Sequence, residues 1–279
     1  MSQDTQKPSL PSTLYTEEYF LNACEGYEEF VESQGERLSR RLSEAFAFAE
    51  VKAGMPVLDV GCGRGEILRH VAKLGARAYG IDYAEVAVKL SRAATQDEPA
   101  PIGVYRTDAK RLPYPSNTFD RALMFDVVEH LYPWELDAAL KDIYRVLKPQ
   151  GMIVVHTAPN RWYDQYAYPG VRFVRRLQGQ RYPANPRALN VEANVEVHVN
   201  EQSVVSLRQY LRRAGFDQVK VWLNSPPQHR RESLVFRAAR HVAFTWIPFR
   251  WFFEREVFAV GVKQGRSHVE GYARSSRRR

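Results

Sequence analysis

The chain has 279 residues, 44% of them apolar, and a formal net charge of +8. This apolar content supports a sizeable core and argues against a largely disordered chain. The two cysteines, Cys24 and Cys62, show neither a metal-ligand spacing nor a disulfide framework, which indicates a reducing compartment.

The N-terminal segment is polar and lacks the apolar stretch of a secretory signal, and no apolar run approaches the roughly 20 residues that span a membrane. We therefore expect a cytoplasmic protein. Residues 1–13 are expected to be disordered. Residues 16–50 are rich in Glu and in apolar side chains at helical spacing, which predicts a helical cap with breaks near Gly26 and Gly35.

From residue 51 onward, apolar strands alternate with amphipathic helices. Strands are predicted at 55–61, 77–82, 103–108, 119–128 and 151–160, and helices at 65–76, 84–95 and 133–149. This alternation predicts an α/β fold, in which a doubly wound, mostly parallel sheet is covered on both faces. In such sheets ligands bind at the carboxyl ends of the strands.

The stretch VLDVGCGRG crosses that edge of the sheet. It has a glycine at every second position, at Gly61, Gly63 and Gly65. Glycine lets the backbone turn sharply and approach a ligand. A dinucleotide-binding turn reads G-x-G-x-x-G, but Glu66 takes the place of its last glycine, and a carboxylate in the first helical turn repels a diphosphate. No Lys-Ser or Lys-Thr follows, which excludes a P-loop.

Asp82 ends the second predicted strand, 21 residues after Gly61. An acid at this place accepts hydrogen bonds from both hydroxyls of an adenosine ribose. Together with the glycine spacing, it favours an adenosine-bearing ligand without phosphates.

These residues resemble the first two motifs of the class I S-adenosylmethionine-dependent methyltransferases. The resemblance continues through RTDAKRLPYPSNTFDRALMFDVVEHL, LKDIYRVLKPQGMIVVHTAPN and LRQYLRRAGF, and covers about residues 51–223. Within this family, the sequence is similar to the broad subgroup that acts on small molecules. The resemblance implies S-adenosyl-L-methionine as cofactor and a Rossmann-like sheet of seven strands, the last of them antiparallel. The candidates for the last two strands are 216–224 and 254–264.

The resemblance also implies roles for individual residues. The implied cofactor-binding residues are Asp59, Gly61, Cys62, Gly63, Gly65, Asp82, Tyr83, Asp108, Ala109 and Asp126. Among them, Asp59 orients the loop or reaches the amino group, and Asp82 binds the ribose. Asp108 receives the adenine amino group with Ala109 beside the ring, and Asp126 lines the methyl donor. Asp59 as a cap of the turn and Asp108 as a turn residue stay open as purely structural alternatives.

Three histidines are candidate catalytic bases, because histidine titrates closest to neutral pH. His130 lies four residues after Asp126, where some small-molecule members of the family carry a catalytic histidine. His156 lies near the end of the fifth strand, and His198 precedes a helix at 201–214 whose predicted cap is Asn200. The alternative for each is a histidine that only holds a loop. No Cys, His and Asp cluster has metal spacing, so no metal is expected.

The connection 161–196 is long and rich in aromatic residues and arginine, as is typical of a lid. Its candidates for the wall of an acceptor pocket are Trp162, Tyr163, Tyr166 and Tyr168. Its candidates for contact with an acidic or phosphate-bearing acceptor are Arg172, Arg175 and Arg176. A surface subdomain with solvated arginines is the alternative. Tyr15, Tyr19 and Phe20 lie where relatives fold a helix over the cofactor.

Between the last two predicted strands, 225–253 contains a predicted basic amphipathic helix from about Arg231 to Ile247, followed by aromatic residues. Such a helix can lie in a membrane interface. The alternative is that its apolar face packs on the sheet or forms a dimer contact. The predicted organisation is therefore a cap at 1–50, a methyltransferase domain at 51–264 with insertions at 161–196 and 225–253, and a disordered basic tail at 265–279.

The function expected from this resemblance is in-line methyl transfer from S-adenosyl-L-methionine to a small-molecule, glycan or lipid-linked acceptor, at oxygen. We expect a monomer or homodimer with possible peripheral contact at the inner face of a membrane. Methylation of RNA or protein and a non-catalytic cofactor-binding module stay open. Nucleic acid is disfavoured because FDVVEHLYPW lacks the Pro-Pro-aromatic sequence of relatives that methylate base amino groups.

Overall fold

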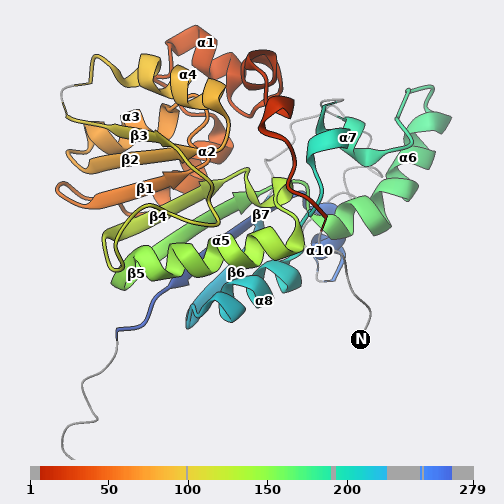
Figure 1. Ribbon diagram of the computed structural model, residues 1–279. Helices are drawn as coiled ribbons and strands as arrows, with labels where there is room; N and C mark the ends of the chain where they lie inside the picture. Colours follow the sequence, from red (N-terminus) through yellow and green to blue (C-terminus); the bar gives the residue numbers. More distant parts are fainter. Residues whose placement is uncertain (1–6, 99, 190–192, 225–245, 247, 266–279) are drawn as a thin grey trace, which may run out of the picture.

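The computed structural model describes residues 7–98, 100–189, 193–224, 246 and 248–265. Seven strands form one sheet in the order β3-β2-β1-β4-β5-β7-β6 (Figure 1). The strands are β1 (Pro56–Val60), β2 (Arg77–Asp82), β3 (Gly103–Arg106), β4 (Phe119–Phe125), β5 (Leu147–Thr157), β6 (Gln218–Asn224) and β7 (Glu256–Val262). Strands β1 to β5 pair in parallel, whereas β7 runs antiparallel to both β5 and β6. The predicted fold class and the two predicted last strands are confirmed.

Helices cover both faces of this sheet. The α-helices are α1 (Tyr27–Ser33), α2 (Arg40–Ala47), α3 (Glu66–Lys73), α4 (Glu85–Thr95), α5 (Pro133–Val146), α6 (Tyr168–Leu177), α7 (Asn194–Val197), α8 (Val204–Ala214) and α10 (Phe249–Phe253). Shorter 3-10 and π turns are η1 (Ser12–Leu14), η2 (Tyr19–Ala23), η3 (Val128–His130), η4 (Tyr163–Ala167) and η5 (Pro186–Leu189). The apolar faces of α5 and α8 pack on one side of the sheet, and those of α2 and α3 on the other (Figure 1).

The central strand β1 is buried along its whole length, including Asp59, as expected of a strand covered on both faces. Its neighbours are β2 on one side and β4 on the other. The strand order therefore reverses at β1. In an open α/β sheet, the loops at such a switch point diverge and leave a crevice at the carboxyl ends of the strands.

The N-terminal segment differs from the expectation of disorder in residues 7–13. Trp134 donates a hydrogen bond from Nε1 to the carbonyl oxygen of Lys7, and Lys110 Nζ donates to Ser9 Oγ. The predicted breaks lie at Gly26 and Gly35, which both have positive φ angles of 78° and 79°. These contacts hold the N-terminal segment beside the carboxyl edge of the sheet.

Two local predictions have different outcomes. The cap of α8 is Ser203 and not Asn200, because Ser203 has extended backbone and its hydroxyl accepts the N–H of Ser206. The predicted helix at 231–247 lies outside the described residues except for Trp246, as does the predicted tail from residue 266 onward. Among the described residues, no helix combines the length and apolar character needed to cross a bilayer.

Candidate functional site

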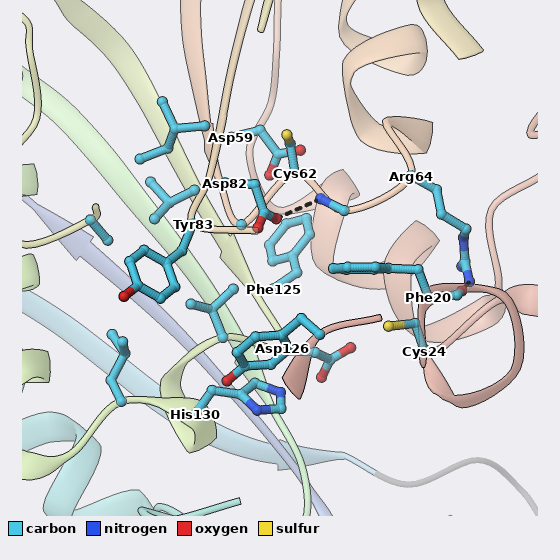
Figure 2. Close-up of a pocket in the computed structure, with 18 of the residues that line it drawn as sticks. Phe20, Cys24, Asp59, Cys62, Arg64, Asp82, Tyr83, Phe125, Asp126 and His130 are labelled. Atoms are coloured by element: carbon cyan, nitrogen blue, oxygen red, sulfur yellow. Dashed lines mark hydrogen bonds between the residues drawn. The ribbon is translucent and has the colours of Figure 1, made fainter. Parts of the chain in front are cut away.

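A pocket with an empty volume of about 1230 Å³, including its open mouth, lies at the carboxyl ends of β1, β2 and β4. It is lined by the loops after these strands and by the N-terminal segment that contains Tyr15, Tyr19 and Phe20. In the view of Figure 2, Asp59 and Asp82 lie at one end of the pocket and Asp126 and His130 at the other.

Most of the residues singled out from the sequence meet at this pocket. Those that line it are Asp59, Gly61, Cys62, Gly63, Asp82, Tyr83, Asp108, Ala109, Asp126 and His130. Gly65, His156 and His198 are not among its lining residues. They lie behind it, and their contacts show what they do there.

The three glycines of the loop after β1 have different neighbours. A Cβ atom on Gly61 would lie 2.3 Å from Val127 Cγ2, and one on Gly65 would lie 2.6 Å from Ser91 Oγ. One on Gly63 would find nothing nearer than Phe20, at 3.9 Å across the pocket. Gly63 therefore gives a ligand access to the backbone, whereas Gly65 lets the start of α3 pack closely on α4.

Asp82 is fixed by the backbone on either side of it. Its Oδ2 accepts the N–H of Gly63 at 3.1 Å (Figure 2). Its Oδ1 accepts the N–H of Ala84 at 2.8 Å. Burial raises the pKa of Asp82 to about 6, although these backbone N–H groups oppose the shift. Each carboxylate oxygen keeps a second lone pair, so the side chain can still accept ligand hydroxyls.

Asp59 lies on β1 behind the glycine loop. Burial, together with the nearby charges of Asp82 and Glu66, raises the pKa of Asp59 to about 8. Two desolvated carboxyl groups at one end of a pocket favour a ligand that brings positive charge or hydrogen-bond donors.

Asp108 follows β3 and is held by Lys110. Its Oδ1 accepts the backbone N–H of Lys110 at 2.9 Å, and Lys110 Nζ lies 2.8 Å from its Oδ2. Lys110 also bonds Glu135 at 2.7 Å. The hydrogen bond from the Lys110 N–H agrees with the alternative that Asp108 only stabilises a turn. Asp108 also lines the pocket, so contact with the adenine amino group stays a prediction.

Asp126 follows β4 with a positive φ of 53°, which turns its side chain out of the strand direction. Its Oδ1 lies 2.8 Å from Nδ1 of the fully buried His156, while its Oδ2 is buried without a partner among the described residues. Burial opposes the charge of Asp126, but His156 and Arg41 hold the pKa of this carboxyl well below its usual range. His156 thus acts on the pocket through Asp126.

His130 faces the pocket with its ring fixed on both sides. Its Nδ1 lies 3.1 Å from the carbonyl oxygen of Val197, so Nδ1 carries the proton and Nε2 presents a lone pair. The hydroxyl of Tyr19 lies 3.4 Å from Nε2. Burial and the neighbouring His198 lower the pKa of His130 to about 3, so the ring is neutral at physiological pH.

His198 stands behind His130, with ring centroids 5.0 Å apart. Together with Glu129, the two histidines place one ligand atom each within 4.8 Å of one another. This grouping was not foreseen, because residues 129 and 198 are far apart in sequence. Burial raises the pKa of Glu129, and its Oε2 accepts the hydroxyl of Thr157 at 2.7 Å. The expectation of no metal stays a prediction.

Arg64 was missed by the sequence analysis. It lies between Gly63 and Gly65 and is 3% exposed. Its Nη1 donates to the carbonyl of Phe20 at 2.7 Å and its Nη2 to the carbonyl of Glu25 at 2.5 Å, while Nη2 also reaches Glu66 at 3.0 Å. The arginine inside the glycine motif, two residues before a glutamate, was the available signal. This side chain ties the glycine loop to the N-terminal cap.

The aromatic residues of 161–196 do not line the pocket described above. Tyr163 and Tyr168 are buried in a separate cluster with Tyr182 and Phe252, and Trp162 stacks on Phe252. The apolar wall of the pocket comes instead from the N-terminal cap, through Tyr15, Tyr19 and Phe20.

Comparison with known proteins agrees with this geometry. Residues 58–155 match a family model described as a methyltransferase domain. The chain is 29% identical over 110 residues to a ubiquinone biosynthesis O-methyltransferase of Bartonella bacilliformis, covering 39% of this chain and 44% of the relative. It is 27% identical over 198 residues to a ubiquinone/menaquinone biosynthesis C-methyltransferase of Burkholderia vietnamiensis, covering 65% and 76%.

The chain spans about half the length of the first curated relatives that it matches, 53% and 44%. Among solved structures, it resembles a putative methyltransferase of Haloferax volcanii, solved in complex with the Trm112 methyltransferase activator. The TM-score is 0.60 at 18% identity, over 92% of this chain and all of the other. This likeness shows the shared fold.

Proposed function

We propose that this chain, which belongs to the class I S-adenosylmethionine-dependent methyltransferase family, transfers a methyl group from S-adenosyl-L-methionine to an oxygen atom of a small-molecule acceptor. The observation that carries the proposal is the pairing, in one pocket, of the Asp82–glycine loop with Nε2 of His130, which the Tyr19 hydroxyl contacts at 3.4 Å. The Asp82–glycine loop suits the cofactor, and His130 suits the hydroxyl group of an acceptor.

The residues present fit this cofactor. Asp82 has free lone pairs for ribose hydroxyls, Gly63 leaves the backbone accessible, and Asp126 has a buried oxygen without a partner among the described residues. The raised pKa values of Asp59 and Asp82 show that this end of the pocket disfavours bare carboxylates, and a cationic ligand offsets that cost. When bound, S-adenosyl-L-methionine supplies an electrophilic methyl group on a positively charged sulfur.

The role of His130 follows from its tautomer. The carbonyl of Val197 holds the proton on Nδ1, so Nε2 accepts the proton of an acceptor hydroxyl that takes the place of the Tyr19 hydroxyl, 3.4 Å away. A pKa of about 3 makes His130 a weak base but keeps it deprotonated throughout the physiological range. A weak base suffices here, because a hydroxyl oxygen becomes strongly acidic as it gains a methyl group. The walls contributed by Tyr15 and Tyr19 orient the acceptor and keep water out.

The names of the relatives support an acceptor of the quinone-precursor class, a hydroxylated ring with an apolar chain. The aromatic wall of the pocket offers such a ring apolar contacts. One of the two relatives methylates carbon by its name, so methylation of an activated ring carbon is the second candidate. RNA or protein methylation and a non-catalytic module are the remaining alternatives.

The test is transfer of an isotope-labelled methyl group to catechols and other hydroxylated aromatic acceptors, followed by mass spectrometry of the product. His130→Ala is expected to lower turnover of an oxygen acceptor by about 100-fold or more, with cofactor affinity near that of the unmodified protein. His70→Ala, on α3, is the matched control. Intact turnover in His130→Ala would assign His130 a structural role, and failure to bind the cofactor at all would refute the proposal.

A further inference from the structure

An exposed apolar stripe runs along α6. Phe173 is 64% exposed and Leu177 is 73% exposed, with Val174 beside them. Their spacing of three and four residues places them on one face of the helix. Large apolar side chains that share one exposed face are unusual in a soluble domain and mark a contact surface.

The exposed apolar surface continues beyond α6. Tyr166, at the end of η4, is 64% exposed, and its ring contacts Phe252 of α10 at 5.7 Å. On α10 itself, Phe249 and Trp251 are exposed. Figure 1 shows α6 and α10 on the same side of the molecule, where α6 extends away from the sheet. We call the side chains of Tyr166, Phe173, Val174, Leu177, Phe249 and Trp251 the apolar surface.

The α6 part of this surface is flanked by charges of one sign, whereas α10 carries Arg250 paired with Glu254. Residues 165–189 contain no Asp or Glu but five arginines, at positions 172, 175, 176, 181 and 187. Arg187 pairs with Glu201, whereas Arg172, Arg175 and Arg176 form no ion pair with an acid in the described part of the chain. Aromatic and aliphatic side chains flanked by arginines without an acidic partner among the described residues match the interface of an anionic bilayer.

We propose that α6 and α10 dock this protein on an anionic phospholipid surface. The proposal deepens the proposed function and rests on it, because it supplies the route by which an acceptor with an apolar chain enters. The segment leading to α6 leaves the sheet at the end of β5, and the pocket lies at the carboxyl ends of β1, β2 and β4. Strands β1 to β5 run in parallel, so docking through α6 presents the same edge of the sheet to the lipid.

Charge argues against two other occupants. A symmetric contact between two copies would bring the arginines of α6 against each other, without acids in 165–189 to offset them. The segment 225–245 lies outside the described residues, and its sequence has four arginines against one acid, Glu232. It therefore offers the arginines of α6 no complementary charge. An anionic phospholipid surface supplies the negative charge that these arginines complement.

Flotation with vesicles tests the proposal, using phosphatidylcholine alone or mixed with phosphatidylglycerol. We expect binding only to the anionic vesicles and a loss of binding as salt is raised. Arg175→Gln with Arg176→Gln is expected to weaken binding about 30-fold, and Phe173→Ser with Leu177→Ser about tenfold or more. Leu74→Ser with Val205→Ser, two exposed apolar residues elsewhere, is the matched control and should bind normally.

Equal binding to neutral vesicles, no binding, or unchanged binding by both α6 variants would overturn the proposal. So would a dimer in analytical ultracentrifugation that dissociates in Phe173→Ser with Leu177→Ser. A loss of thermal stability in that variant, without loss of binding in the arginine variant, would assign the stripe to internal packing. Cofactor affinity by calorimetry and methylation of a soluble catechol are measured without vesicles, so failure of docking and failure of the proposed function give different results.

Discussion

At the scale of the residue, the pocket contains two carboxyl groups, Asp59 and Asp82, whose pKa values are raised by burial. Asp82 has a pKa raised to about 6 and Asp59 one raised to about 8, whereas Asp126 is held ionised by His156 and Arg41. At neutral pH Asp59 is therefore mainly protonated, whereas Asp82 and Asp126 are mainly ionised. A ligand that donates hydrogen bonds and carries positive charge draws Asp82 into its ionised form.

This linkage predicts a pH-dependent cofactor affinity. Between pH 5 and pH 7 Asp82 loses its proton, so affinity should rise by up to about tenfold per unit below the pKa and then level off. Without cofactor, the folded protein binds more protons than the unfolded chain between the usual Asp pKa of 3.8 and about 6. The contribution of Asp82 to stability should therefore fall as pH rises through that window.

Calorimetry at several pH values checks the affinity, and urea unfolding checks the stability. Asp82→Asn should remove the step near pH 6 and weaken binding by roughly 1–3 kcal/mol, the range for a lost charged hydrogen bond. Asp97→Asn, at an exposed position, is the control. A pH profile that is the same in Asp82→Asn would contradict the assignment of Asp82 to the ribose.

At the scale of the element, the close packing of α3 on α4 depends on Gly65. This residue precedes α3 with a φ of 88°, and an added Cβ would meet Ser91 Oγ at 2.6 Å and Ser91 Cα at 3.0 Å. Gly54 has a similar φ of 80° but open space around it. The two glycines share a backbone conformation and differ in packing.

Gly54→Ala is expected to cost about 1 kcal/mol of unfolding free energy, from the positive φ alone. Gly65→Ala should cost a further 1–3 kcal/mol or so, because Ser91 and α4 must move. Denaturant unfolding of both variants measures the difference. Equal losses would mean that α4 adjusts freely and that packing does not require glycine at position 65.

The buried side chain of Arg64 joins the N-terminal cap to the glycine loop. Replacing it with Met keeps most of the apolar stem but removes the donors to Phe20 and Glu25, and leaves Glu66 buried without its partner. We expect faster amide hydrogen exchange over residues 15–30 and a cofactor affinity about tenfold lower or more. Arg77→Met, at an exposed position, is the control. Unchanged exchange in Arg64→Met would show that the cap is held by other contacts.

The sequence predicted what depends on local spacing. The glycine loop, Asp82 and the alternation of strands and helices follow from neighbouring residues, and the structure has them at one edge of one sheet. It did not predict contacts between distant segments: Arg64 reaches a carbonyl 44 residues away, and His130 one 67 residues away. The aromatic content of 161–196 suggested a pocket wall, but composition does not determine which way a ring points. Tyr163 and Tyr168 are buried in a separate hydrophobic cluster.

At the scale of the whole molecule, an acidic pocket lies in a basic chain. The net charge is +8, and residues 266–279, which lie outside the described residues, contribute five arginines against one glutamate. Half of the excess charge is therefore carried by a short terminal sequence and not by the domain around the pocket. This distribution separates unspecific attraction to polyanions from recognition of an acceptor.

Deleting 266–279 tests whether RNA is an acceptor or only a polyanion held by this sequence. If the arginines act only by charge, RNA binding should fall toward background, and the slope of log affinity on log salt should flatten by up to about 3.5, for five arginines on single-stranded RNA. Cofactor affinity and methylation of a soluble hydroxylated acceptor should not change. Filter binding across a salt series, beside calorimetry, gives both results. RNA binding that survives the deletion and is displaced by a small-molecule acceptor would place RNA at the pocket and favour the nucleic-acid alternative.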